Sequence, residues 1–133
     1  VSLPYESPVR GIATSGWRGR CLSLGIADAV TVLAGSAATA DVAATLIANE
    51  VNVDYPGIIK RPASEVKDDS DLGMLPVTVD VPALPAAQIS EALKRGAQTA
   101  GNFIRSGKIA AAYLSQQKQT LVVENNLKEE PDE

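Results

Sequence analysis

The stretch ADAVTVLAGSAATADVAATLIANEV, residues 27–51, decides the fold of this 133-residue chain. Its first part, Ala27–Ala34, contains a β-branched cluster that is apolar on both faces, which predicts a buried central strand. Gly35 then breaks the strand. From Ser36 to about Val51 the chain is rich in alanine, which predicts a helix with Ser36 as its N-cap. The largely apolar circumference of this helix predicts that it lies inside the core.

Further elements are expected on the C-terminal side of this stretch. Leu75–Val81 alternates apolar and polar residues, the period of a half-exposed strand with Thr78 and Asp80 on its solvent face. Pro85 predicts the start of a helix that runs to roughly Ser106. Ile109–Leu114 predicts a last apolar strand, and a second apolar run, Leu121–Val123, follows it.

This order of elements predicts an α+β layered fold with a small mixed sheet and two main helices. Residues 52–73 are rich in turn-forming and acidic residues, which predicts a long irregular connection. The length suits one domain over residues 1–123, followed by an acidic tail, residues 124–133, that we expect to be flexible.

The composition excludes several classes of function. With 12 basic and 16 acidic side chains, the chain lacks the excess of positive charge that nucleic-acid binding requires. It has no histidine and a single cysteine, Cys21, which excludes structural zinc sites and an internal disulfide. A nucleophile–histidine pair would need its base from another chain.

The sequence contains no apolar run of about 18 residues and no basic–apolar leader pattern. We therefore expect a chain without a membrane span that is located in the cytoplasm, or in the periplasm if a leader has been removed.

One group of candidate residues lies near the N-terminus. Thr14, Ser15 and Gly16 precede Arg18 and Arg20, so hydroxyls, backbone N–H groups and positive charge are predicted in a single turn. Such a turn can hold a phosphate or pyrophosphate. Taken in isolation, the same residues favour an ordinary turn with solvated arginines. The glycine indicates that the backbone approaches something closely.

A second pair of candidates lies in the alanine-rich helix. Asp41 and Thr45 are four residues apart and share one helix face. A carboxylate inside a core is costly unless it is paired or binds a cation, and these two oxygen donors suit Mg2+ or Ca2+. Spacing alone favours a simpler interpretation, in which Asp41 complements the helix dipole and Thr45 is a tolerated small residue.

Taken together, four segments of the chain resemble the C-terminal part of the ApbE superfamily, which includes the FAD:protein FMN transferases. They are Gly11–Gly16 (GIATSG), Val30–Ala34 (VTVLA), Ser36–Ala38 (SAA) and Ala40–Thr45 (ADVAAT). The closer likeness is to an uncharacterised family allied to ApbE, carried by Ala13–Arg20 (ATSGWRGR) and Ser23–Asp28 (SLGIAD).

This resemblance implies an ApbE-like fold and a set of site residues. Asp41 and Thr45 would bind Mg2+, and Thr14, Ser15, Gly16 and Arg18 would contact FAD or FMN. ApbE-type enzymes carry a His-x-x-Asp-Pro segment that this chain lacks. Their full-length forms are also longer, which implies either that an N-terminal partner, half of one precursor or a separate subunit, completes the cleft, or that this chain is a fragment.

Three functions follow as hypotheses. The first is a subunit that binds a flavin or another phosphate-bearing ligand with Mg2+, together with the N-terminal partner. The second is a hydrolase subunit acting on an amide or ester, with Ser15 or Thr14 as nucleophile. The third is a non-catalytic binding or assembly protein.

Overall fold

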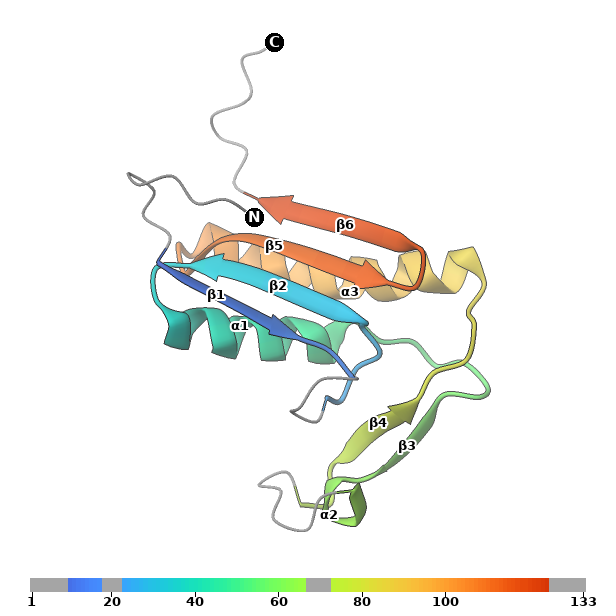
Figure 1. Ribbon diagram of the computed structural model, residues 1–133. Coiled ribbons are helices and arrows are strands. Elements are labelled where there is room, and N and C mark those ends of the chain that lie inside the picture. The colour runs from blue at the N-terminus through green and yellow to red at the C-terminus, as the bar shows by residue number, and fades with distance from the viewer. Residues whose placement is uncertain (1–9, 18–22, 67–72, 125–133) are drawn as a thin grey trace.

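The computed structural model describes residues 10–17, 23–66 and 73–124. These residues form a four-stranded sheet of order β1-β2-β5-β6, with α1 and α3 on one face, and a separate two-stranded sheet of β3 and β4 (Figure 1). The elements are β1 Gly11–Ser15, β2 Ala29–Ala34, α1 Ala37–Glu50, β3 Ile59–Pro62, α2 Ala63–Val66, β4 Pro76–Asp80, α3 Ala86–Arg105, β5 Ile109–Gln116 and β6 Gln119–Glu124. The expectation of an α+β fold with two main helices is confirmed, and all four strand pairings are antiparallel.

The core lies between the larger sheet and its two helices. Val30 and Val32 of β2 pair with Leu114 and Ala112 of β5, and all four side chains are fully buried. Cross-strand partners share a face, so these residues form the surface on which α1 and α3 pack. The predicted central strand is therefore confirmed as β2.

Helix α1 begins where the sequence predicts. The Ser36 hydroxyl accepts a hydrogen bond from the backbone N–H of Thr39 at 3.1 Å, so the N-cap is confirmed. The expectation that this helix lies wholly in the core is wrong, because the side chains of Val42 and Leu46 are 57% and 45% exposed. Alanine fits both buried and exposed positions, so an alanine-rich circumference does not reveal which face is covered.

Helix α3 is the other main helix and starts at the predicted proline, although Pro85 is its N-cap residue and Ala86 its first helical residue. It packs closely on the core through Gly96, where an added Cβ would lie 2.3 Å from Cγ2 of Val51. Gly107, with a φ of 78°, follows the helix and turns the chain into β5.

The expectation of an irregular connection over residues 52–73 is wrong in part. Within it, β3 forms and pairs with β4, and α2 follows. Thr78 does not lie on a solvent face as predicted but is 3% exposed. The segment at Ser23 lies against this part of β4, and the carbonyl of Ser23 accepts a hydrogen bond from the backbone N–H of Thr78 at 2.8 Å. Asp80 is exposed as expected.

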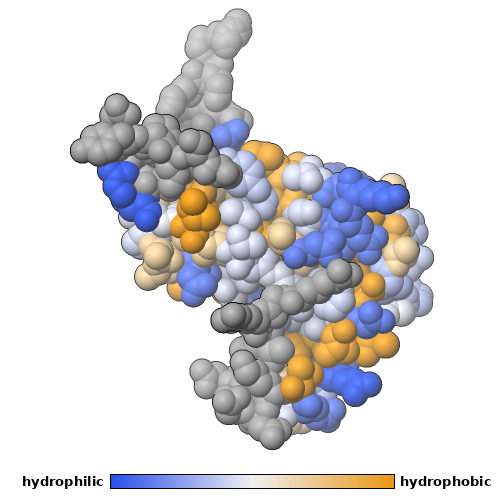
Figure 2. All heavy atoms as spheres, viewed as in Figure 1, coloured by the Kyte–Doolittle hydropathy of each residue, from blue (hydrophilic) through white to orange (hydrophobic). Residues whose placement is uncertain are grey.

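The hairpin of β3 and β4 extends away from the larger sheet (Figure 1). Apolar side chains are exposed on it and beside it, in the lower part of the face shown in Figure 2. On the hairpin and beside it, the exposed large apolar side chains are those of Ile59, Val66, Met74 and Leu75. Of the predicted tail, Glu124 ends β6 and residues 125–133 lie outside the described part of the chain.

Candidate functional site

Thr14 and Ser15 are the last two residues of β1 and not part of a turn, so the single-turn expectation is wrong. Consecutive strand residues point to opposite faces. Thr14 pairs with Thr31 on the sheet face without helices, and their hydroxyl oxygens lie 2.9 Å apart. Ser15 pairs with the buried Val30 and therefore lies on the helix-covered face. The two hydroxyls thus cannot act together on one ligand group at the end of β1.

Gly16 confirms the expected close approach of the backbone. A Cβ at this position would lie 2.3 Å from the backbone oxygen of Asp28, and the next N–H, of Trp17, donates to the carbonyl of Ala27 at 3.0 Å. The close neighbour that requires a glycine at position 16 is thus the backbone of Asp28, just before β2. Arg18 and Arg20 lie outside the described residues.

Asp28 is a connecting residue that sequence reasoning missed. One carboxylate oxygen accepts a hydrogen bond from the indole N–H of Trp17 at 3.3 Å, and the other accepts from the backbone N–H of Gln117 at 2.7 Å. The side chain of Gln117 in turn binds the backbone at Pro82 and Leu84. Asp28 therefore links the end of β1, the β5–β6 turn and the segment before α3.

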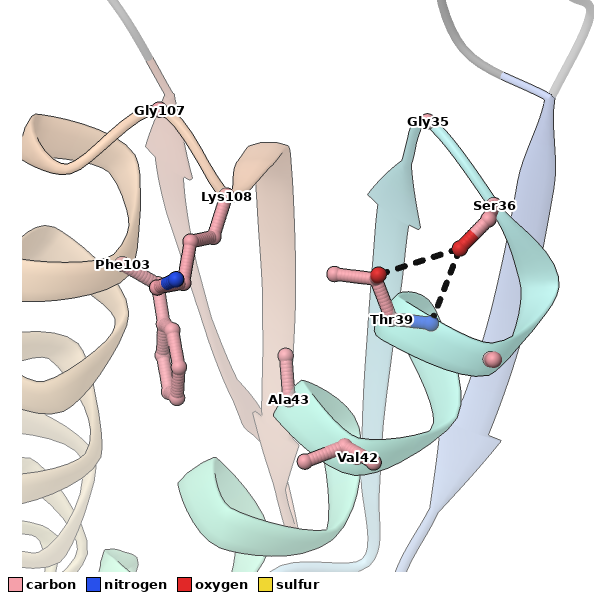
Figure 3. A pocket seen from close by; sticks show the side chains of 9 residues that line it. Gly35, Ser36, Thr39, Val42, Ala43, Phe103, Gly107 and Lys108 are labelled. Atoms are coloured by element: carbon pink, nitrogen blue, oxygen red, sulfur yellow. Dashed lines mark hydrogen bonds between the residues drawn. The ribbon is translucent and has the colours of Figure 1, made fainter.

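Asp41 and Thr45 share a flank of α1, as their spacing predicts. On the opposite flank, Thr39 and Ala43 face Phe103 of α3 across a hollow (Figure 3). Asp41 is exposed and Thr45 is half-buried. The expectation of a carboxylate inside the core is therefore wrong, because the buried face of α1 is formed by Ala40, Ala43, Ala44, Ile47 and Ala48, and Asp41 lies outside it.

The flank of α1 that carries Asp41 and Thr45 faces away from α3 and toward the side of β1. Strand β1 is an edge strand, and within residues 10–17, 23–66 and 73–124 no strand pairs with its outer side. Gly11 and Ser36 are in close contact at the start of β1 and α1, which run side by side in the same direction (Figure 1). From Gly11 to Ser15, the four residues of β1 advance about 14 Å. From Ser36 to Thr45, about nine residues of α1 advance the same distance, so Ser15 and Thr45 lie at the same level.

Lys60 is an ionisable residue that the sequence did not single out. Its ammonium donates to the carbonyl of Leu24 at 2.6 Å, and the Asn52 amide donates to the same oxygen at 3.4 Å. Burial lowers the pKa of Lys60 from its ordinary value, and the nearby charge of Asp54 opposes this shift. These contacts fasten the β3–β4 hairpin to the segment before β2.

Asp41 and Thr45 fit a magnesium site only in part. The described part of the chain contains no group of three or more His, Cys, Asp or Glu residues arranged to hold a metal ion. The two residues offer two hard oxygen donors, whereas Mg2+ takes about six. The remaining ligands would come from water, a bound phosphate or another chain.

A family model described as AbpE bacteria matches residues 1–123. This chain belongs to the AbpE bacteria family. No curated protein and no solved structure matches the chain. The AbpE bacteria match covers Thr14–Gly16, Arg18, Asp41 and Thr45, so every candidate residue lies within the family segment.

A further feature of this AbpE bacteria chain is a hollow of about 540 Å³ at the other flank of α1 (Figure 3). None of the candidate ligand-binding residues from the sequence lines it. The lining residues are Gly35, Ser36, Ala38, Thr39, Val42, Ala43, Phe103, Gly107 and Lys108. Among the described helices, none has the length and apolar character needed to cross a membrane.

Proposed function

We propose that this chain is a subunit that binds a flavin, FAD or FMN, or another phosphate-bearing ligand, together with Mg2+ and an N-terminal partner chain. One observation carries the proposal: Asp41 and Thr45 lie one turn apart on the flank of α1 beside the edge of β1, with which no described strand pairs. Carboxylate and hydroxyl oxygens at one accessible place form a donor set that suits a hard divalent cation.

The chemistry of the donors favours Mg2+ with a phosphate. A bound Mg2+ would neutralise the negative charge of a phosphate. Without a cation, the carboxylate of Asp41 repels an anionic ligand. The proposal therefore predicts that ligand binding depends on the cation and on Asp41.

The edge of β1 supports a partner chain. An edge strand presents unpaired backbone N–H and C=O groups, and strand addition is a common way for another chain to bind them. A strand added there would lie beside the flank of Asp41 and Thr45 and would bring further ligands to the metal. Ser15 is half-buried on the helix-covered face of β1, at the level of Thr45, and its hydroxyl is therefore the one best placed to contact the ligand.

No observation favours the hydrolase hypothesis as a second candidate. In the described residues, the Thr14 hydroxyl is bonded to the Thr31 hydroxyl, which is not a base. We therefore propose binding and not catalysis, and a non-catalytic binding role is compatible with this proposal.

Isothermal titration of FAD and of FMN tests the proposal, with Mg2+ in one series and EDTA in the other. The protein should be purified with any chain that accompanies it. We expect at least about tenfold tighter binding with Mg2+, and the loss of this difference in Asp41→Asn and Thr45→Val. Glu50→Gln, an exposed acid of the same helix outside the proposed site, is the matched control and should retain it. Absence of heat with both flavins, or equal binding in EDTA, would contradict the proposal.

A further inference from the structure

We propose that the hollow between the start of α1 and the end of α3 binds a small amphiphilic anion. Its carboxylate or phosphate would contact Lys108, and its apolar part would lie on Val42, Ala43 and Phe103 (Figure 3). This site lies on the flank of α1 opposite Asp41 and Thr45. The inference is therefore independent of the proposed function.

The inner surface of the hollow is apolar. Ala43 is buried at its base, Phe103 is half-buried on the α3 side, and Val42 is 57% exposed on the α1 side. The volume of about 540 Å³ is of the size that small molecules occupy in proteins. An apolar ligand body would cover the exposed valine and the phenyl ring, which water now contacts.

Lys108 gives the hollow its charge. In the described ranges its ammonium has no hydrogen bond or ion pair, and no aspartate or glutamate lines the hollow. The hydroxyls of Ser36 and Thr39 lie 3.0 Å apart and are bonded to one another. Lys108 is therefore the group that selects an anion, and its flexible stem lets the ammonium follow the ligand.

The rim of the hollow is open at two glycines. A Cβ added at Gly35 or at Gly107 would meet no atom within 4 Å, so the chain itself does not crowd these positions. A ligand can thus reach the apolar surface without displacing a described element. Together, an apolar base, one cation that has no partner among the described residues and an open rim favour a ligand with a single anionic group and a short tail.

Octanoate and octyl phosphate are the probes, with acetate supplying the charge alone and octanol the tail alone. Amide chemical shifts are followed by NMR during each titration. We expect the two amphiphiles to bind with shifts centred on Val42, Phe103 and Lys108, and the two partial probes to bind at least about tenfold more weakly. A preference between carboxylate and phosphate identifies the head group.

Matched variants assign the binding to the hollow. Lys108→Gln and Val42→Ser should each weaken octanoate binding about fivefold or more, whereas Lys94→Gln and Val122→Ser, at other exposed positions, should not. Asp41→Asn should also leave it unchanged, which separates this site from the proposed metal site. Binding of acetate as tight as that of octanoate, shifts spread over β6, or unchanged binding in Lys108→Gln would overturn the inference.

Discussion

The carboxylate of Asp28 accepts a hydrogen bond from the backbone N–H of Gln117 at 2.7 Å, across 89 positions of the sequence. Gln117 has a φ of 52° in the turn between β5 and β6. The contact therefore holds a residue in the left-handed region, which non-glycine residues seldom adopt. The same carboxylate binds Trp17, so one side chain fixes the end of the sheet at which β1 finishes.

Removal of this carboxylate should destabilise the protein. We expect Asp28→Ala to lower the free energy of unfolding by about 1.5–3 kcal/mol, because a charged acceptor of two hydrogen bonds is lost. Asp28→Asn retains one acceptor oxygen and should cost less. Urea unfolding followed by circular dichroism measures both variants. An unchanged stability of Asp28→Ala would show that the contact contributes nothing to folding.

A methyl group at Gly16 should also be destabilising. Its Cβ would lie 2.3 Å from the backbone oxygen of Asp28, and we expect a loss of about 1–3 kcal/mol from overpacking. Gly35→Ala is the matched control, because nothing lies within 4 Å of its added Cβ. Thermal and urea unfolding of the two variants should differ clearly. Equal stabilities of Gly16→Ala and Gly35→Ala would contradict the close approach of Gly16 to the backbone of Asp28.

Gln116 presents a buried amide that has no partner among residues 10–17, 23–66 and 73–124. The side chain is fully buried at the end of β5, and within these ranges neither its oxygen nor its nitrogen makes a hydrogen bond. Replacing an unpaired amide by an apolar group of similar size removes a desolvation cost. Gln116→Met should therefore raise the free energy of unfolding by about 1–3 kcal/mol. A loss of stability in urea unfolding would instead reveal that the amide has a partner in solution.

Lys60 predicts a pH dependence of stability. Because burial lowers its pKa in the folded protein below the ordinary 10.5, the unfolded chain binds more protons between the two values. Stability should therefore increase as the pH rises through this interval. Urea unfolding at about pH 8, 9 and 10 should show this increase in the wild type relative to Lys60→Met. Parallel curves for the two proteins would contradict the lowered pKa.

Local signals predicted much of the fold. Ser36 and Pro85 mark the starts of α1 and α3, because an N-cap hydroxyl and a helix-starting proline act within one turn of the chain. The face of α1 that is buried was not predictable in the same way. Val42 is exposed and Ala43 is buried because only one face of the helix is covered, and which face that is depends on tertiary packing.

The candidate site was predictable to a smaller extent. That Asp41 and Thr45 share a flank follows from helix periodicity. That this flank lies beside β1 can be predicted only when the strand order is known. The glycine that follows Thr14 and Ser15 indicates a bend and so predicts one turn, whereas the β1–β2 register separates their side chains. The role of Asp28 was missed because its partner lies in a distant hairpin.

The central claim is that Asp41 and Thr45 hold a divalent cation, and paramagnetic Mn2+ tests it most directly as a substitute for Mg2+. In the presence of FMN, we expect Mn2+ to broaden the amide signals around Asp41, Thr45 and Ser15 first, with no such effect in Asp41→Asn. Broadening that is absent, or that is centred on another acidic region and unchanged in Asp41→Asn, would contradict the claim.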